Sequence, residues 1–207
     1  MLFKQGDVVL FQGDSITDWG RNREDSDSLG SGYAYIAASL FEAEHPEMGV
    51  HFLNRGVGGD HIAEMHARWQ EDCIDLHPDW ISILIGINDV WSNAGGDENA
   101  ITAAEYEQHL REMLEDVRDK TEAGIILCEP FVQPYPEDRI GWRVFLDPMI
   151  HAVRSLAREF GARLVPFDGL LAQASALREP SYWSKDGVHP TPPGFALMAK
   201  AWLKTIE

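Results

Sequence analysis

The chain has 207 residues, and its 44% hydrophobic and 25% charged content is that of a globular protein able to bury a sizeable core. It carries 34 acidic against 17 basic side chains, a net charge of −17. Such a charge repels phosphate backbones and anionic lipid surfaces, so we expect neither nucleic acid nor a membrane as partner.

The N-terminal sequence MLFKQGDVVLF has no basic region followed by a long apolar core, so we expect no secretory signal. No apolar run approaches the roughly 20 residues that span a bilayer. Cys73 and Cys128 are expected to be buried free thiols. Together these features predict a cytoplasmic protein.

Short apolar runs alternate with amphipathic segments along the whole chain. The apolar runs predict strands at Val8–Phe11, His51–Leu53, Trp80–Ile85, Ile125–Leu127 and Arg163–Val165. The amphipathic segments predict helices at Tyr33–Ala43, Asp60–Leu76, Thr102–Glu122, Val144–Phe160 and Pro193–Ile206. This alternation favours one α/β domain over residues 1–207, with a parallel sheet covered by helices on both faces. Ligands of such folds bind beyond the carboxyl ends of the strands.

Two of the predicted helices carry start signals. Thr102 with Glu105 three residues later forms a capping-box pattern, and Thr191 followed by Pro192 is typical of a helix N-terminus. Segment 60–76 is expected to be one helix with a single buried face, because its apolar residues recur every three or four positions: Ile62, Met65, Trp69, Cys73 and Leu76.

Four polar motifs lie at the predicted strand ends and before the last helix. They are residues 13–17 (GDSIT), 54–60 (NRGVGGD), 86–89 (GIND) and 186–189 (DGVH). Each motif alone is ordinary turn chemistry, since Gly, Asp, Asn and Ser are common in turns. Their joint placement at one edge of the predicted sheet favours a shared site.

The first and last motifs supply the groups that nucleophilic ester hydrolysis needs. Ser15 is a candidate nucleophile, His189 a candidate base, and Asp186 a carboxylate able to orient the imidazole. The turn that folds Asp186 back to His189 is made easier by Gly187. The backbone N–H groups of Ser15 and Gly59, with the side-chain amide of Asn88, are candidate donors to an oxyanion.

In this order, the four motifs resemble the blocks of the SGNH hydrolases, also called GDSL-type esterases. The family's four letters match Ser15, Gly59, Asn88 and His189, and the match extends from the first strand to the last helix. The resemblance implies a flavodoxin-like three-layer α/β/α sandwich around a parallel five-stranded sheet. It also implies a Ser15–His189–Asp186 triad and an oxyanion hole of Ser15, Gly59 and Asn88. No metal and no organic cofactor are implied.

Three longer stretches are similar to bacterial intracellular acetylxylan esterases of this family. They are LFQGDSITDWGR, ARWQEDCIDLHPDWISILIGINDVW and VHPTPPGFALMAKAWL. The resemblance implies a small, neutral acetylated xylo-oligosaccharide as substrate and favours assembly into a homo-oligomer. The chain departs from that pattern mainly in segments 130–143 and 178–185, which are expected to shape the substrate pocket.

Three tryptophans lie close to the motifs along the chain. Trp19, Trp91 and Trp183 are candidates to stack on sugar rings or to wall an acyl pocket, and Trp142 is a weaker candidate. Core or interface packing is the alternative for each of them.

Three other functions remain open at this point. The first is a lipolytic or thioester-cleaving member of the same family, of the lysophospholipase type, acting on longer acyl chains. The second is a non-catalytic carbohydrate-binding protein. The third is a metal-dependent phosphoesterase, for which the candidate ligands are Asp14, Asp89, Asp186 and His189.

Overall fold

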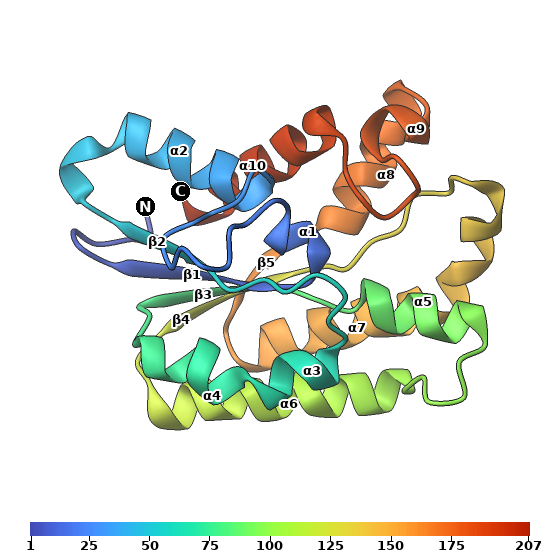
Figure 1. Cartoon of the computed structure of the whole chain (residues 1–207), viewed down its shortest axis with the longest axis horizontal. Coiled ribbons are helices and arrows are strands. Elements are labelled where there is room, and N and C mark those ends of the chain that lie inside the picture. The colour runs from blue at the N-terminus through green and yellow to red at the C-terminus, as the bar shows by residue number, and fades with distance from the viewer.

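The computed structural model describes all 207 residues and contains one sheet of five parallel strands in the order β2-β1-β3-β4-β5 (Figure 1). The strands are β1 (Val8–Gly13), β2 (His51–Asn54), β3 (Trp80–Leu84), β4 (Gly124–Cys128) and β5 (Arg163–Val165). Each lies within two residues of its predicted range. The α/β class and the five-stranded parallel sheet are therefore confirmed.

Helices cover both faces of this sheet and make three layers. In Figure 1, α2, α8 and α10 lie on one face, and α3, α4, α6 and α7 lie on the other. The helices are α1 (Ser15–Asp18), α2 (Tyr33–Glu44), α3 (Ile62–Ala67), α4 (Trp69–Asp72), α5 (Ile87–Gly95), α6 (Ala103–Lys120), α7 (Arg143–Glu159), α8 (Phe167–Leu177), α9 (Pro180–Trp183) and α10 (Pro192–Ile206). Three short 3₁₀ turns occupy Pro46–Met48, Ile74–Leu76 and Glu137–Trp142.

The single helix predicted over Asp60–Leu76 is wrong. The segment is divided into α3, α4 and a 3₁₀ turn, and Arg68 leaves helical geometry between the two helices (φ −101°, ψ 7°). The Arg68 guanidinium donates to the Gln12 side chain at 3.0 Å and to the Arg55 carbonyl at 2.8 Å. The expected core face is correct as far as Cys73, because Ile62, Met65, Trp69 and Cys73 are buried.

Both predicted helix starts are confirmed. The Glu105 carboxylate accepts from the Thr102 N–H at 2.7 Å, and the Thr102 hydroxyl accepts from the Glu105 N–H at 3.3 Å. At the start of α10 the Thr191 hydroxyl accepts from the Gly194 N–H at 3.4 Å. Each cap satisfies backbone donors that the first helical turn leaves without a partner.

The order of the strands indicates at which edge of the sheet a ligand would bind. The chain passes from β1 outward to β2 and then returns to β3 on the other side of β1. A sheet of this order has a crevice at the carboxyl ends of the two strands between which the direction of winding changes. Ser15 follows β1 and Asn88 follows β3, so the two residues flank this crevice.

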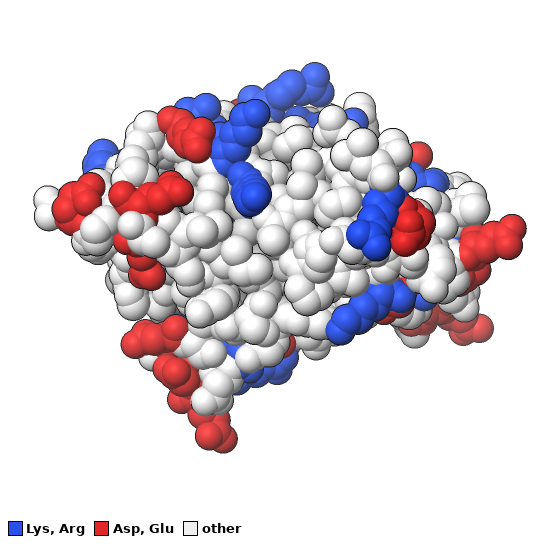
Figure 2. Space-filling model, turned by 90° about the horizontal axis from the view of Figure 1, so that it is seen from above, with Lys and Arg blue, Asp and Glu red and all other residues white.

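The surface charge is unevenly distributed. On the face covered by α2 and α10, acidic side chains gather toward the two ends, while much of the middle is uncharged apart from several basic groups (Figure 2). None of the helices is both long enough and apolar enough to cross a bilayer.

Candidate active site

Three side chains from the two ends of the sequence form a hydrogen-bonded row. The Ser15 Oγ lies 3.0 Å from the His189 Nε2, and the His189 Nδ1 lies 2.7 Å from the Asp186 Oδ2. Because an ionised carboxylate can only accept, the Nδ1 carries the ring proton and the Nε2 lone pair faces the serine hydroxyl. The imidazole is thus oriented to take a proton from Ser15.

A tight turn brings Asp186 and His189 together. The Asp186 Oδ1 accepts from the backbone N–H groups of Val188 at 3.0 Å and of His189 at 2.7 Å. Gly187 has a φ of +88°, and a Cβ at this position would lie 2.1 Å from the Tyr135 carbonyl oxygen. Only glycine fits this turn, both for its backbone conformation and for the space available.

The same hydrogen bonds determine the charge of Asp186. Its burial raises the pKa, but the backbone N–H and the ring of His189 and the N–H of Val188 outweigh this effect, and the pKa lies below its usual value. Asp186 is therefore an anion at neutral pH, the form that favours a protonated imidazole beside it.

The three predicted oxyanion donors, Ser15, Gly59 and Asn88, each keep an N–H group without a protein acceptor. The backbone N–H groups of Ser15 and Gly59 donate to no protein acceptor. The Asn88 amide uses one N–H on the Asp60 carbonyl at 2.9 Å and keeps a second one free. Gly59 has a φ of +95° in an exposed loop, a conformation that favours glycine.

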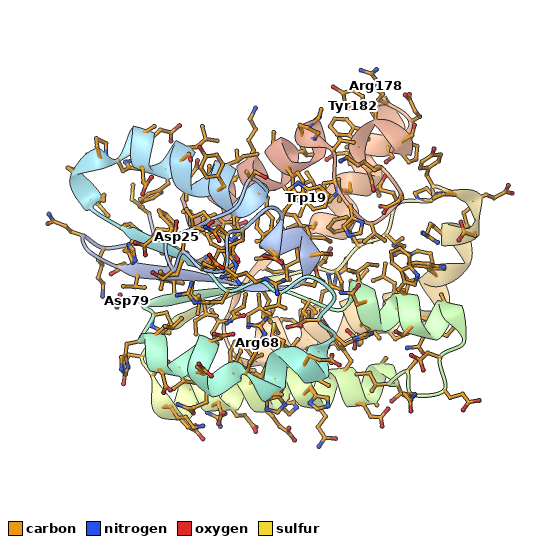
Figure 3. All side chains as sticks on the ribbon, viewed as in Figure 1. Trp19, Asp25, Arg68, Asp79, Arg178 and Tyr182 are labelled. Atoms are coloured by element: carbon orange, nitrogen blue, oxygen red, sulfur yellow. The ribbon has the colours of Figure 1, made fainter.

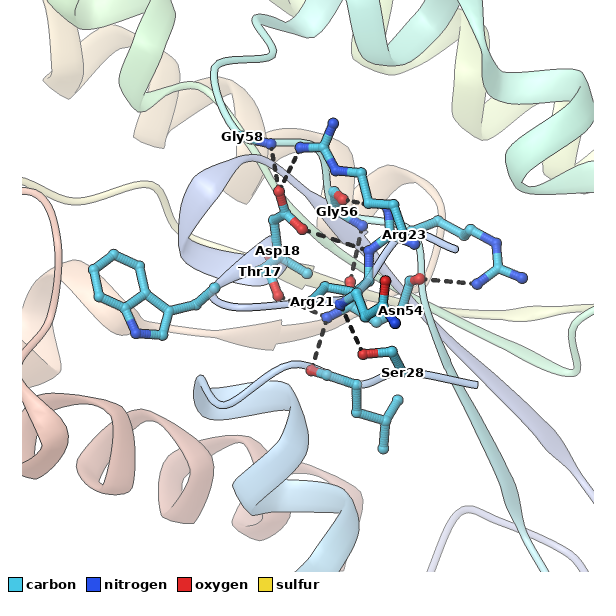
Figure 4. Close-up of polar contacts among 12 residues, drawn as sticks. Thr17, Asp18, Arg21, Arg23, Ser28, Asn54, Gly56 and Gly58 are labelled. Atoms are coloured by element: carbon cyan, nitrogen blue, oxygen red, sulfur yellow. Dashed lines mark hydrogen bonds and ion pairs between the residues drawn. The ribbon is translucent and has the colours of Figure 1, made fainter. Parts of the chain in front are cut away.

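A polar network holds the loop of Gly59 against the turn that carries Ser15 (Figure 4). The Asp18 Oδ2 accepts from the Gly58 N–H at 2.9 Å and from Arg23 at 2.6 Å. Gly58 lies next to Ser15, since a Cβ added at Gly58 would be in van der Waals contact with the Ser15 Cβ, at 3.7 Å. Asp18 was not predictable as part of the site, because the sequence contains no sign that it meets a glycine 40 residues away.

A second network of hydrogen bonds joins the same two loops. The buried Asn54 side chain donates to the Thr17 carbonyl at 2.7 Å and accepts from the Gly56 N–H at 2.8 Å. The Arg21 guanidinium donates to the Gly56 carbonyl at 2.9 Å. These hydrogen bonds fix the position of one loop relative to the other.

Two carboxyl groups are buried next to the serine. Burial, opposed by a hydrogen bond from the Ile16 N–H and assisted by the negative charges of Asp89 and Asp60, raises the pKa of Asp14 to about 7. Burial also raises the pKa of Asp89 to about 7. The Asp14 Oδ2 has no hydrogen-bond partner. Neither carboxyl group takes part in the Ser15–His189–Asp186 row.

Aromatic rings lie against His189 and against an arginine that contacts Asp186. The Trp19 ring lies 5.6 Å from the His189 ring between centroids, and Figure 3 shows Trp19 beside α10. The Arg139 guanidinium lies over the rings of Trp91 and Trp142, at 4.7 and 4.0 Å from their centroids, and the two rings pack on each other with their centroids 5.1 Å apart. Arg139 also donates to the Asp186 carbonyl at 3.2 Å. No motif in the sequence indicates a role for this arginine.

The remaining candidate tryptophans are placed differently. Trp183 donates its indole N–H to the Arg178 carbonyl at 3.1 Å and packs against Tyr182, and no hydrogen bond or ring contact joins it to Ser15 or His189. Trp142 is buried, so it supports Trp91 and Arg139 and offers little surface of its own. Segment 130–143 does border the site, because the Gln133 N–H donates to the Gly187 carbonyl at 2.8 Å.

The candidate metal ligands of the phosphoesterase alternative do not gather. The ligand atoms of Asp14, Asp89, Asp186 and His189 form no cluster that converges on one point. Asp186 and His189 are instead bonded to each other, and Asp14 lies fully buried. The arrangement is that of acid–base and nucleophilic chemistry.

Known proteins are similar to this chain in sequence and fold. The model of the GDSL-like lipase/acylhydrolase family matches residues 11–197. An acetylxylan esterase of Geobacillus stearothermophilus is 34% identical over 214 aligned positions, covering 100% of this chain and 96% of its own.

Solved structures agree with the sequence comparison. The crystal structure of Axe2, an acetylxylan esterase from Geobacillus stearothermophilus, superposes with a TM-score of 0.90 at 32% identity, covering 100% of this chain and 96% of its own. A Parabacteroides merdae protein described as a GDSL-like lipase superposes with a TM-score of 0.92 at 34% identity, covering 99% of this chain and 98% of its own. Catalytic mutants of Axe2 have a serine, an aspartate or a histidine replaced by alanine.

Proposed function

Because this chain belongs to the GDSL-like lipase/acylhydrolase family and is a carboxylic ester hydrolase, we propose that it removes acetyl groups from acetylated xylo-oligosaccharides through an acyl-enzyme on Ser15. The single observation that carries the mechanism is the hydrogen-bonded row. A serine hydroxyl lies 3.0 Å from an imidazole whose far nitrogen lies 2.7 Å from a carboxylate. Serine hydrolases of unrelated folds use the same arrangement.

In the proposed reaction the Ser15 Oγ attacks the acetyl carbonyl while the His189 Nε2 takes the hydroxyl proton. The tetrahedral intermediate collapses as His189 returns this proton to the sugar oxygen, so that the sugar leaves as an alcohol and acetyl-Ser15 remains. A water molecule, deprotonated by His189, then releases acetate and restores Ser15. Asp186 stabilises the imidazolium in both halves of the reaction.

The attack by Ser15 and the later attack by water each form a tetrahedral intermediate. Each intermediate has a negative charge on the former carbonyl oxygen. We assign its stabilisation to the N–H groups of Ser15 and Gly59 and to the free amide N–H of Asn88. One such donor contributes about 3–4 kcal/mol to lowering the barrier.

The substrate assignment rests on the aromatic surroundings and on the relative. The exposed Trp91, supported by Arg139 and Trp142, offers a flat apolar face of the kind on which sugar rings stack. Trp19, beside His189, limits the room next to the imidazole and so favours a small acyl group. The similar Geobacillus protein is an acetylxylan esterase, which points to the same substrate class. Assembly into a homo-oligomer stays a prediction.

The test is acetate release from acetylated xylo-oligosaccharides, measured beside acetylated hexose and amino-sugar substrates. We expect the xylo-oligosaccharides to have the highest kcat/KM. Acetyl and octanoyl esters of one chromophore are compared in parallel, and a preference for octanoate would favour the lipolytic alternative. Binding of the saccharides without acetate release would favour a carbohydrate-binding protein.

The nucleophile is tested in the same assay with Ser15→Ala. We expect kcat to fall by a factor of at least about 10³, as in other serine hydrolases, with the unfolding transition unchanged. Ser26→Ala, at an exposed serine of the neighbouring loop, is the matched control and is expected to keep full activity. Full activity of Ser15→Ala would rule out the acyl-enzyme on this residue.

A further inference from the structure

Three metal-ligand side chains converge at a place that the ester hydrolysis does not use. His66 lies on α3, and His109 and Glu112 lie on α6. The His66 Nδ1 lies 2.9 Å from the His109 Nδ1 and 3.8 Å from the Glu112 Oε2, and one ligand atom of each of the three residues lies within 4.8 Å of the other two. All three side chains are half-buried.

The packing of two helices creates this convergence. α3 lies against α6 on the same side of the sheet (Figure 1). His109 and Glu112 are three residues apart and therefore share one face of α6. The Gln108 side chain donates to the Glu112 Oε1 at 3.0 Å, which orients the carboxylate and leaves its Oε2 toward His66.

Hydrogen bonds alone cannot satisfy all three polar groups of this cluster well. Two imidazole nitrogens that face each other need one proton between them, and the carboxylate approaches the same His66 nitrogen. One N–H on His66 cannot align well with both acceptors. A cation bound between them would take the lone pairs of all three groups at once.

The distances suit such a cation. Two nitrogens bound to zinc at 2.0–2.1 Å in tetrahedral geometry lie about 3.3 Å apart, close to the separation of the two Nδ1 atoms. Two imidazoles and one carboxylate are ligands that zinc, cobalt, nickel and copper prefer, whereas magnesium and calcium prefer oxygen alone. Three protein ligands leave one tetrahedral position for water.

We propose that His66, His109 and Glu112 form a binding site for one divalent transition-metal ion, such as zinc. The bound ion would hold α3 against α6. The site shares no residue with the Ser15–His189–Asp186 row. α3 begins shortly after the loop of Gly59, so the bound ion anchors the helix that follows this loop.

The test starts from purified full-length protein dialysed against a chelator and then against metal-free buffer. Titration with ZnCl₂ is expected to show one bound ion per chain by calorimetry. At a free zinc concentration about 100 times the Kd, the melting temperature is expected to rise by about 5 °C or more. MgCl₂ at the same concentration is expected to leave it unchanged.

Variants identify the ligands. His109→Gln and, independently, Glu112→Gln are expected to weaken zinc binding at least about tenfold and to abolish most of the thermal shift. CoCl₂ is expected to give a visible absorption band with the wild type that His109→Gln lacks. The control is His151→Gln, at an exposed histidine of α7, which is expected to bind zinc like the wild type.

Two results would overturn the proposal. Wild-type protein that shows neither stoichiometric zinc binding nor a thermal shift would mean that the two histidines form only a hydrogen-bonded pair. Zinc binding that survives both His109→Gln and Glu112→Gln would place the ion elsewhere. Esterase activity is measured alongside and is expected to persist in the metal-free protein.

Discussion

Asp14 and Ser15 are neighbours in the sequence but have different surroundings. The Ser15 hydroxyl contacts His189, whereas the Asp14 side chain is fully buried. Burial raises the pKa of Asp14 to about 7, against about 3.9 in an unfolded chain. Between these two values the folded protein keeps a proton that the unfolded chain has lost. Stability therefore falls as the pH rises from about 4 to 7, and the full penalty is present above pH 7.

We expect Asp14→Asn to remove this pH dependence. Asparagine keeps the oxygen that accepts from the Ile16 N–H but carries no charge. From pH 5 to pH 8, the unfolding free energy of the variant is expected to improve relative to the wild type by on the order of 2 kcal/mol. Urea unfolding at both pH values measures this change, with the exposed Asp25→Asn as control. A constant difference between variant and wild type would show that Asp14 is ionised throughout this range.

At the scale of elements, the loop before α3 depends on the end of α1. The Asp18 carboxylate accepts from Gly58, the residue before the proposed oxyanion donor Gly59. We expect Asp18→Ala to lower kcat by about tenfold, because a displaced donor loses part of its roughly 3–4 kcal/mol contribution. KM is expected to change less than twofold, since the proposed acyl-enzyme mechanism needs this donor in the transition state.

The control for Asp18→Ala is Glu24→Gln, at an exposed carboxylate in the loop after α1. Both variants are compared by steady-state kinetics and by their melting temperatures. A loss of kcat that follows a loss of stability, or an equal change in KM, would assign Asp18 to general folding of the loop and not to placement of Gly59.

Local patterns predicted the sheet and the polar motifs, because apolar runs and turn residues are visible over a few positions. The break at Arg68 was not predictable from helical periodicity, since its causes, Gln12 and the Arg55 carbonyl, lie far along the chain. α8 was missed as well, because its apolar residues are spread around the helix and Gly169 lies inside it. Asp18 and Arg139 were missed for the same reason as the break, because each acts on a residue about 40 or more positions away.

At the scale of the whole molecule, a net charge of −17 produces a negative field around the site. Two of the cations near the row are already paired, Arg23 with Asp18 at 2.6 Å and Arg139 with Asp138 at 2.5 Å. Lys185, above the Trp19 ring, has no acidic partner. Arg55, in the loop of Gly59, donates only to backbone carbonyls. These few unpaired cations do not offset the net charge of −17, so we expect the field to stay negative and to favour neutral saccharides over acidic ones.

This field makes the reaction with acidic substrates depend on salt. The Debye length falls from about 30 Å at 0.01 M to about 8 Å at 0.15 M ionic strength, so salt screens the repulsion. We expect kcat/KM for an acetylated oligosaccharide that carries a uronic acid to rise on the order of threefold over this range. A neutral acetylated xylo-oligosaccharide of equal length is the control and is expected to react at a constant rate. A fall in kcat/KM for the acidic substrate would instead mean that Lys185 and its neighbouring arginines dominate the local field.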